Sequence, residues 1–267
     1  MTARERKEEM TKVPISACII AYNEEENIRE CLKSIAWVDE IVVVDAFSED
    51  RTAEVCREFT DKVYKKKWPG FKEQKNYALS LATNDWVLSI DADERVSPEL
   101  AREISEVLSK YGESINGFYF PRRAYYLGGW INHGGWYPNY QLRLFRKERT
   151  CWVGADLHER AEVQGPTQLL KNDLWHFAHK DLAEHLKTVS NYSDIASKEM
   201  HSLGKKFHLW QIILYPPVKF LETYILKCGF MDGVAGLIIA LMTSYYVFLK
   251  YAKLWEKERM ADAHTGH

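Results

Sequence analysis

Three short apolar runs, each ending in or followed by polar residues, constrain the fold of this chain more than any other feature. The runs are Ile15–Ala21, Glu40–Asp45 and residues 86–90, and all three are rich in β-branched or aromatic residues. Runs of this length and composition are typical of strands buried on both faces of a parallel sheet. Segments with apolar residues at helical spacing separate the runs, so the sequence predicts consecutive βαβ units.

The intervening segments carry helix signals. Apolar residues share one face of a predicted helix beginning near Ile28, and a second amphipathic pattern covers residues 71–82. Ser97 followed by Pro98 predicts a helix start, with Ser97 as the N-cap of a helix that runs to about residue 109. The first half of the chain is therefore predicted to be an α/β domain.

The second half of the sequence lacks this regular alternation of strand and helix patterns. Short strands are expected at residues 117–120 and 141–146, and an amphipathic helix at 181–200. Between the two strands, residues 125–140 are rich in glycine and aromatic side chains. From residue 205 onward the composition shifts to an apolar, basic stretch.

Composition excludes several classes of protein. Of the 267 residues, 46% are hydrophobic and 28% charged, which is ordinary for a globular chain and rules out a disordered one. The net charge of −2 argues against a nucleic-acid partner. Five cysteines without C-x-x-C spacing suggest neither a zinc site nor a disulfide framework. No apolar segment follows the charged N-terminus, so we expect no signal peptide. We therefore expect a cytoplasmic protein.

The predicted chemistry lies where the three apolar runs end. Tyr22-Asn23-Glu24 and Asp91-Ala92-Asp93 follow the first and third runs, and Asp45 ends the second. Ligands of open α/β sheets bind beyond the carboxyl ends of the strands, so these side chains are expected to meet. Two carboxylates one residue apart can hold Mg²⁺ or Mn²⁺ together with phosphate oxygens. A solvated turn is the alternative for an isolated Asp-x-Asp, but its place after the third strand of the series favours the metal.

Five segments carry a resemblance to a known family: ACIIAYNEEENI, EIVVVDAFSEDRT, GFKEQKNYALSLATNDWVLSIDADERV, GGWINHGGWYPNYQLRLFRK and GADLHERAEV. Through them the chain resembles inverting family 2 glycosyltransferases of GT-A fold over about residues 14–200. Within that family it is most similar to the group of lipopolysaccharide-core β-1,4-glucosyltransferase-like proteins. The resemblance implies a Rossmann-like, mostly parallel sheet flanked by helices, and a nucleotide-sugar donor.

The resemblance also implies roles at the donor site. Tyr22 resembles the tyrosine that stacks on the nucleotide base, and Asp45 the acid that hydrogen-bonds it. Asp91 resembles the acid near ribose and phosphate, and Asp93 the metal ligand. The full nucleotide-sugar set is Tyr22, Asn23, Glu24, Asp45, Lys75 and Asp91, and the metal set is Asp93, Asp91 and His176. For His176, a purely structural role is the alternative.

An inverting transfer needs a base for the acceptor hydroxyl. The resemblance favours Glu159, with Asp156 as a rival, and an ion pair of Glu159 with Arg160 or Arg143 is the structural alternative. Together with Asp93, these acids form the predicted catalytic set.

The acceptor is expected to meet the glycine- and aromatic-rich stretch, because aromatic faces stack on sugar C–H surfaces and glycine permits a loop to move. A packed lid without sugar contact is the alternative. Asn139 stands where the relatives are expected to have Asp, which bears on acceptor contacts. The predicted acceptor-binding residues are Trp130, Trp136, Tyr137, Arg143 and His158.

The C-terminal stretch suggests a membrane surface. Residues 205–259 hold eight Lys and Arg against four Asp and Glu, a net charge of +4. The uncharged run at 234–249 is shorter than the roughly 20 residues of a membrane-spanning helix, and Pro216-Pro217 interrupts the preceding apolar segment. We expect monotopic binding to an anionic leaflet, with a helical pair packed on the catalytic domain or in a homo-oligomer as alternative and a transmembrane hairpin third.

These observations predict a domain division and a function. The expected parts are a charged tail at 1–13, a catalytic domain at 14–204 with donor and acceptor halves at 14–116 and 117–204, a helical extension at 205–257 and a flexible tail at 258–267. The expected activity is metal-dependent transfer of a hexose from a UDP-sugar to a lipid-linked or lipopolysaccharide-core acceptor at the cytoplasmic face of the inner membrane. The alternatives are transfer to a polyprenyl phosphate, a non-catalytic sugar-binding or scaffold protein on the membrane, and nucleotidyl transfer, which the lack of a glycine-rich basic phosphate loop disfavours.

Overall fold

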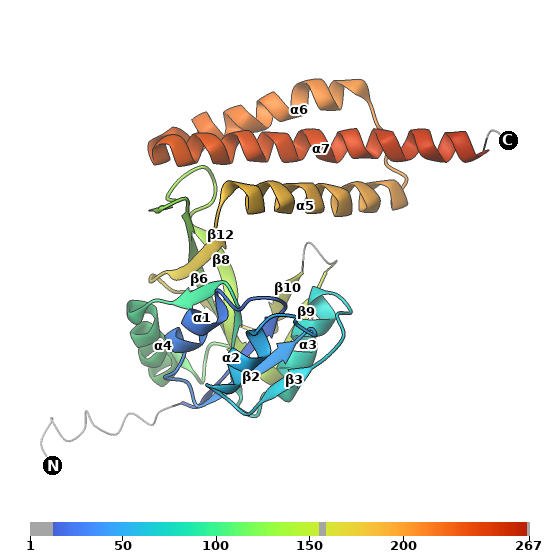
Figure 1. The fold of residues 1–267 in the computed structure, drawn as a ribbon. Coiled ribbons are helices and arrows are strands. Elements are labelled where there is room, and N and C mark those ends of the chain that lie inside the picture. Colours follow the sequence, from blue (N-terminus) through green and yellow to red (C-terminus); the bar gives the residue numbers. More distant parts are fainter. Residues whose placement is uncertain (1–12, 155–158, 266–267) are drawn as a thin grey trace, which may run out of the picture. The chain divides into compact units, whose positions relative to one another are not determined.

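The computed structural model describes the backbone of residues 13–154 and 159–265 (Figure 1). The chain divides into two compact units. The first, here called the sheet unit, contains residues up to Arg122 and residues 139–176. The second, the helical unit, contains residues 123–138 and 177–267.

The sheet unit begins with alternating strands and helices. In chain order these are β1 (Ile15–Ala21), α1 (Ile28–Ser34), β2 (Glu40–Asp45), α2 (Thr52–Arg57), β3 (Val63–Lys65), α3 (Phe71–Leu81), β4 (Trp86–Asp91), β5 (Glu94–Val96) and α4 (Pro98–Tyr111). The later strands are β6 (Gly117–Tyr126), β8 (Asn139–Arg146), β9 (Thr150–Val153), β10 (Arg160–Val163), β11 (Thr167–Leu169) and β12 (Leu174–His179), with a 3₁₀ turn, η2, at Lys147–Arg149.

The strands form a mixed sheet in the order β3-β2-β1-β4-β8-β6-β12-β5. The first four strands are parallel, which confirms the predicted βαβ series. β8 runs antiparallel to both β4 and β6, so the sheet is less uniformly parallel than predicted. β9 and β10 form a separate antiparallel pair.

The register of the central strands brings three strand ends together. Ala21 of β1 lies opposite Asp45 of β2, and Ile20 lies opposite Asp91 of β4. The polar residues at the carboxyl ends of β1, β2 and β4 therefore lie along one edge of the sheet.

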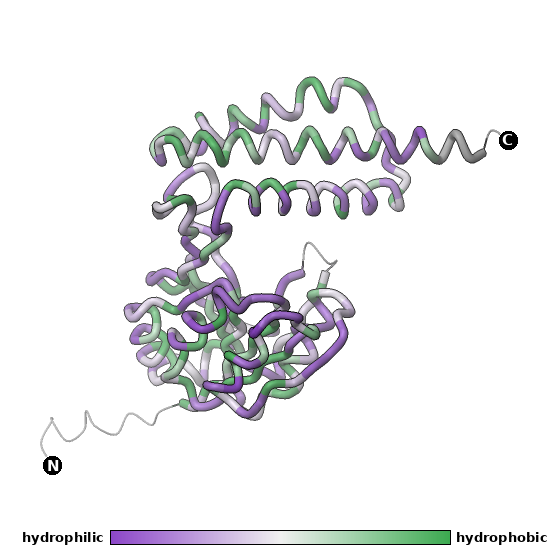
Figure 2. The backbone as a smooth tube through the Cα atoms, viewed as in Figure 1, coloured by the Kyte–Doolittle hydropathy of each residue, from purple (hydrophilic) through white to green (hydrophobic). Residues whose placement is uncertain are grey.

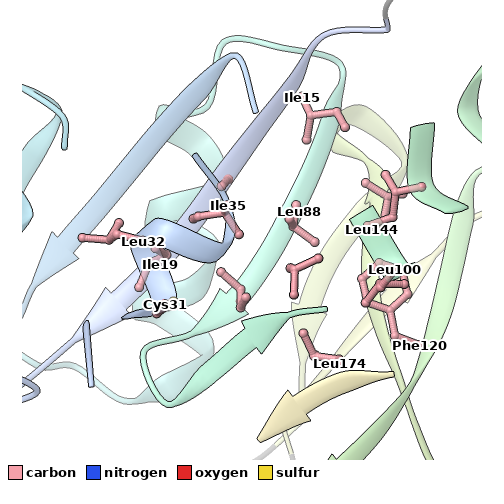
Figure 3. Packing of buried hydrophobic residues seen from close by; sticks show 14 of the residues in the cluster. Ile15, Ile19, Cys31, Leu32, Ile35, Leu88, Leu100, Phe120, Leu144 and Leu174 are labelled. Atoms are coloured by element: carbon pink, nitrogen blue, oxygen red, sulfur yellow. The ribbon is translucent and has the colours of Figure 1, made fainter. Parts of the chain in front are cut away.

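A continuous apolar core supports that edge (Figure 3). Ile19 and Leu88 of adjacent strands are fully buried, and Leu32 and Ile35 of the α1 region pack against them. α4 begins as predicted, since the Ser97 side chain accepts a hydrogen bond from the backbone N–H of Leu100. Truncation of a fully buried leucine such as Leu88 to alanine is expected to cost about 2–5 kcal/mol.

The helical unit contains β7 (Gly129–Trp130), the distal ends of β6 and β12, and the C-terminal helices. These are α5 (Leu182–Ser202), α6 (Leu209–Leu221), the π-helical turn η3 (Glu222–Leu226), the 3₁₀ turn η4 (Gly229–Asp232) and α7 (Gly233–Thr265). α5 is grouped with this unit and packs on α7: Lys253 Nζ donates to Ser190 O at 2.8 Å and lies 3.0 Å from Asp194 Oδ1.

The C-terminal helices differ from expectation in two further details. α6 continues through Pro216 and Pro217, and Ser244 Oγ of α7 donates a hydrogen bond to Pro216 O at 2.8 Å. α7 continues as helix to Thr265, across most of the expected flexible tail. Within the segment Gly229–Met260, α7 is long and apolar enough to cross a bilayer by length and composition.

Candidate active site

The loops after β1 and β2 are joined by reciprocal hydrogen bonds. Asn23, in the left-handed region at φ 54°, donates its N–H to Ser48 Oγ at 3.0 Å, and its Oδ1 accepts from Glu49 N at 2.8 Å. Asparagine tolerates this backbone conformation better than most residues. Beside this junction Tyr22 is half exposed. The loops thus form one rigid rim that leaves an aromatic ring accessible.

Asp45 is buried at the end of β2, where both carboxylate oxygens accept from the backbone N–H of Ser48, at 3.3 and 3.2 Å. Glu24 has a different environment: its N–H donates to Thr52 Oγ1 at 2.7 Å and its side chain accepts from Asn27 Nδ2 at 2.9 Å. Glu24 thus contacts residues before α1 and at the start of α2, while Asp45 stays at the strand end.

Asp91 lies between two cations. Lys75 Nζ of α3 is 3.0 Å from Asp91 Oδ1, and Arg143 of β8 donates to Asp91 Oδ2. Burial by itself would raise the pKa of Asp91, but the positive charges of Arg143 and Lys75 outweigh it and hold the pKa well below its usual range. Asp91 is therefore a carboxylate at neutral pH.

Lys75 connects Asp91 to the predicted base. Its ammonium group is buried, lies 3.2 Å from Glu159 Oε1 and sits 4.4 Å from the centre of the Trp152 ring. Glu159 thus pairs with Lys75, whereas Arg160 pairs with Glu162 at 2.5 Å. Glu159 therefore forms an ion pair with Lys75 and not with Arg160 or Arg143, the partners expected for a structural role. Lys75 also contacts Asp91 at the end of β4.

The neighbouring Asn76 fixes Trp152 in place. Its side-chain amide donates to Trp152 O and accepts from Trp152 N, both at 2.9 Å. β9, which precedes Glu159 in the chain, is thereby held against α3.

Glu94 was not predicted as a site residue. It is completely buried, accepts a hydrogen bond from Asp91 N at 3.0 Å and pairs with Arg143 at 2.7 Å and Arg122 at 3.3 Å. The sequence feature that could have identified Glu94 is its position directly after Asp91-Ala92-Asp93. The residue orients the segment that carries both aspartates.

Asp93 and His176 form a separate pair. His176 Nε2 of β12 lies 3.2 Å from Asp93 Oδ2, and both side chains are partly exposed. Burial would raise the pKa of Asp93, but His176 lowers it overall by charge and hydrogen bonding. Among the described residues, no group of three or more His, Cys, Asp and Glu side chains is arranged to hold a metal ion.

This pair nevertheless fits a divalent cation whose remaining ligands come from a nucleotide and water. A carboxylate oxygen and an imidazole nitrogen are both competent ligands, and Mg²⁺ and Mn²⁺ commonly keep positions for phosphate oxygens. Asp91 fits less well as a ligand, because each of its oxygens already faces a cation.

Residues 16–161 match the model of the family described as Glycosyl transferase family 2. The chain belongs to this family. It is 28% identical to the lipopolysaccharide core biosynthesis glycosyltransferase LpsC of Rhizobium meliloti, over 93% of this chain and 94% of LpsC. An uncharacterised glycosyltransferase of Rickettsia typhi is also 28% identical, over 91% of this chain and 87% of that protein.

A solved structure agrees with the fold of this family 2 glycosyltransferase. The mannosyltransferase PcManGT of Pyrobaculum calidifontis, in complex with GDP-Man and Mn²⁺, matches with a TM-score of 0.54 and 14% identity, over 92% of this chain and 88% of that one. The predicted family, the GT-A type of fold and the assignment as an enzyme are confirmed.

The predicted acceptor-binding residues of this glycosyltransferase have different environments. Arg143 is 3% exposed and pairs with Asp91 and Glu94, so it holds these two acids together and is not accessible on the sheet surface. Arg146, on the same strand, pairs with Asp85 and lies over the Trp86 ring.

The aromatic residues of the acceptor set belong to the helical unit. The Trp130 ring packs edge-on against the Tyr125 ring, with 5.1 Å between the ring centres. The Trp136 and Tyr126 rings pack with 5.6 Å between their centres. The Arg123 guanidinium lies 5.7 Å from the centre of the Tyr137 ring. These rings are held by neighbours of their own unit. Asp156 and His158 lie outside the described residues.

Proposed function

We propose that this glycosyltransferase moves a hexose from a nucleotide sugar, specifically a UDP-sugar, to a lipid-linked or lipopolysaccharide-core saccharide. The observation that carries the proposal is the cluster at the ends of β1, β2 and β4. It combines an accessible aromatic ring at Tyr22, a buried acid at Asp45 and the charged group of Asp91, Lys75 and Glu159. The saccharide class of the acceptor is supported by the similarity to LpsC along nearly the whole chain.

In this proposal the chain's own residues bind and orient the donor. Tyr22 stacks on the base and Asp45 hydrogen-bonds it, with Asn23 and Glu24 shaping the rim. Lys75 and Asp91 face the ribose and diphosphate. Asp93 and His176 would hold Mg²⁺ or Mn²⁺, and the ion would neutralise charge on the departing diphosphate.

Glu159 is proposed as the base. It accepts the proton of the acceptor hydroxyl while that oxygen bonds to the anomeric carbon and the bond from this carbon to the diphosphate breaks, so the anomeric configuration inverts. Lys75, 3.2 Å away, fixes the position of the carboxylate. Asp156 is the rival base.

The membrane part of the proposal rests on the exposed side chains of α6. Lys219 is the only residue of α6 with a formal charge. Hydrophobic residues recur along α6 and α7 (Figure 2). We propose peripheral binding to the anionic cytoplasmic face of the inner membrane, since aromatic and apolar residues combine with a net charge of +4 over residues 205–259. The exposed residues of α6 are Leu209, Trp210, Ile213, Leu214, Val218 and Leu221.

The donor assignment is tested by thermal unfolding with Mn²⁺ and a series of nucleotide sugars. A UDP-sugar at about 100 times its Kd is expected to stabilise the protein by about 2.7 kcal/mol, more than guanosine or adenosine counterparts at equal concentration. EDTA and Asp93→Asn are each expected to reduce the shift, while Glu99→Gln, a substitution at an exposed position on α4, leaves it unchanged. A protein that no uridine nucleotide stabilises with any metal would disprove the donor assignment.

A further inference from the structure

The turn between α6 and α7 holds the glycine- and aromatic-rich loop of residues 127–138. The Asp232 carboxylate is almost fully buried and accepts hydrogen bonds from Asn132 N at 3.2 Å and His133 N at 2.8 Å, and it lies 2.9 Å from His133 Nδ1. Gly134 N donates to Lys227 O at 2.8 Å. One carboxylate and one carbonyl of the turn therefore satisfy three consecutive backbone N–H groups of the loop.

Glycines at the junction permit this close approach. A Cβ on Gly135, which has φ +80°, would lie 2.8 Å from Lys227 Cδ. A Cβ on Gly229 would lie 2.7 Å from Thr223 O, and one on Gly236 would lie 1.8 Å from Gly229 O. The backbone of the turn is thus packed against the start of α7, and the loop is packed against the turn.

The same turn exposes large apolar side chains. Leu226 is 78% exposed and Met231 61% exposed, although they lie within a few residues of buried Asp232. Ile225, Phe230 and Val234 are exposed as well. Lys227, in the middle of this group, is partly exposed and pairs with Glu222 at 2.5 Å. The net positive charge therefore belongs to residues 205–259 as a whole, at +4. An apolar surface within such a basic stretch suits an anionic bilayer, and it continues the exposed apolar side chains of α6.

We propose that the segment 225–234 inserts into an anionic lipid surface and that Asp232 is a positioning residue, which holds the loop of residues 127–138 at that surface to receive a lipid-linked acceptor. This inference rests on the proposed function for the class of acceptor. Contact of the turn with the membrane and the conformational order of the loop of residues 127–138 are thereby coupled through the Asp232 side chain.

The experiment is amide hydrogen exchange on the full-length protein, with and without vesicles of phosphatidylethanolamine containing about 30 mol% phosphatidylglycerol. In the wild-type protein, vesicles are expected to slow exchange in 225–234 and at residues 132–134 by roughly tenfold or more. In Asp232→Ala, vesicles still protect 225–231, but the additional protection of the loop is lost. Asp232→Asn, which keeps the shape of the side chain, is expected to be intermediate and carries the test if the alanine variant does not fold.

Two controls separate this inference from general instability and from the proposed function. Asp194→Ala removes another acid of the helical unit, the partner of Lys253, and is expected to leave the vesicle effect on the loop unchanged. Stabilisation by uridine diphosphate with Mn²⁺ is expected to be equal in wild type and Asp232→Ala. Loss of that stabilisation in the wild type itself would count against the proposed function and leave the exchange result standing.

Three results would overturn the inference. The first is equal loop protection with vesicles in wild type and Asp232→Ala. The second is a turn that vesicles leave unprotected. The third is protection that appears without vesicles as protein concentration rises, which would assign the apolar surface to a second copy of the chain.

Discussion

At the residue scale, the defining feature is the charge alternation around Lys75. This buried ammonium group touches the carboxylates of Asp91 and Glu159, and Asp91 in turn touches Arg143. A buried ion cluster is tolerated when each charge has a partner, and removal of one member leaves another uncompensated. The cluster therefore connects Asp91, which we propose faces the donor, to the proposed base Glu159.

Glu159→Gln is expected to slow transfer to a hydroxyl acceptor by about 10²- to 10⁴-fold, because the amide cannot accept the hydroxyl proton. Binding of UDP with Mn²⁺ is expected to change little. Initial rates of transfer measure the effect, and Glu162→Gln, at the exposed partner of Arg160, is the matched control. Undiminished turnover of Glu159→Gln would remove the base assignment and favour a phosphate acceptor, which is already nucleophilic.

The sequence was sufficient to predict that three candidate site residues share one edge of the sheet, because the carboxyl ends of neighbouring parallel strands lie along the same edge. Tyr22, Asp45 and Asp91 follow directly from that rule. The roles of Glu94 and Arg143 did not follow, since these partners are 49 residues apart and meet only because β8 returns antiparallel beside β4. Local patterns carry no information on such a pairing.

At the scale of elements, Glu40 connects β1 and β2 at their N-terminal ends. Its carboxylate accepts from Ser16 Oγ of β1, Lys62 Nζ, and Thr83 N and Oγ1 at 2.8 and 2.9 Å. Burial would raise the pKa of Glu40, but the bonds from Lys62, Ser16 and Thr83 lower it from 4.5 to about 2. The carboxylate is thus more acidic in the folded than in the unfolded chain.

This difference predicts a pH-dependent contribution to stability. Glu40 stabilises the fold fully above pH 4.5, and the contribution is lost as pH falls toward 2, because the unfolded chain takes up the proton first. Glu40→Gln is expected to cost roughly 1–3 kcal/mol near neutral pH. The gap between wild type and variant, measured by urea unfolding, should narrow below pH 4.5; a constant gap from pH 7 to 3 would contradict the assignment.

The elements themselves were predictable where one pattern dominated. β1 and β2 match their predicted ranges, and α4 begins at its predicted cap. The prolines of α6 predicted an interruption that the structure does not have, and the packing of α5 on α7 has no local signature in the sequence.

At the scale of the whole molecule, charge and exposed apolar area are distributed unequally along the sequence. The apolar surface of α6 is the part that the membrane proposal requires, and all of its residues belong to the helical unit. Single exposed apolar residues are ordinary on soluble proteins, whereas a contiguous set marks an interaction surface.

Ile213→Asp combined with Val218→Asp is expected to lower partitioning onto anionic vesicles at least about tenfold, since two charges replace apolar contact with lipid. Cosedimentation measures the effect. Leu169→Asp, at a comparably exposed leucine of β11 in the sheet unit, is the matched control and should bind as the wild type does. Equal binding of all three proteins would reject α6 as the lipid-contacting element.

The order in which the chain visits its two units has a consequence for recombination. The chain leaves the sheet unit after Arg122, returns at Asn139 and leaves again after His176. An exchange of the C-terminal helices alone between relatives would separate the loop of residues 127–138 from the carboxylate of Asp232 that holds it. A functional chimera must therefore exchange both segments together, so the loop and the helices are expected to be inherited as one module although 38 residues of the sheet unit, 139–176, separate them in the sequence.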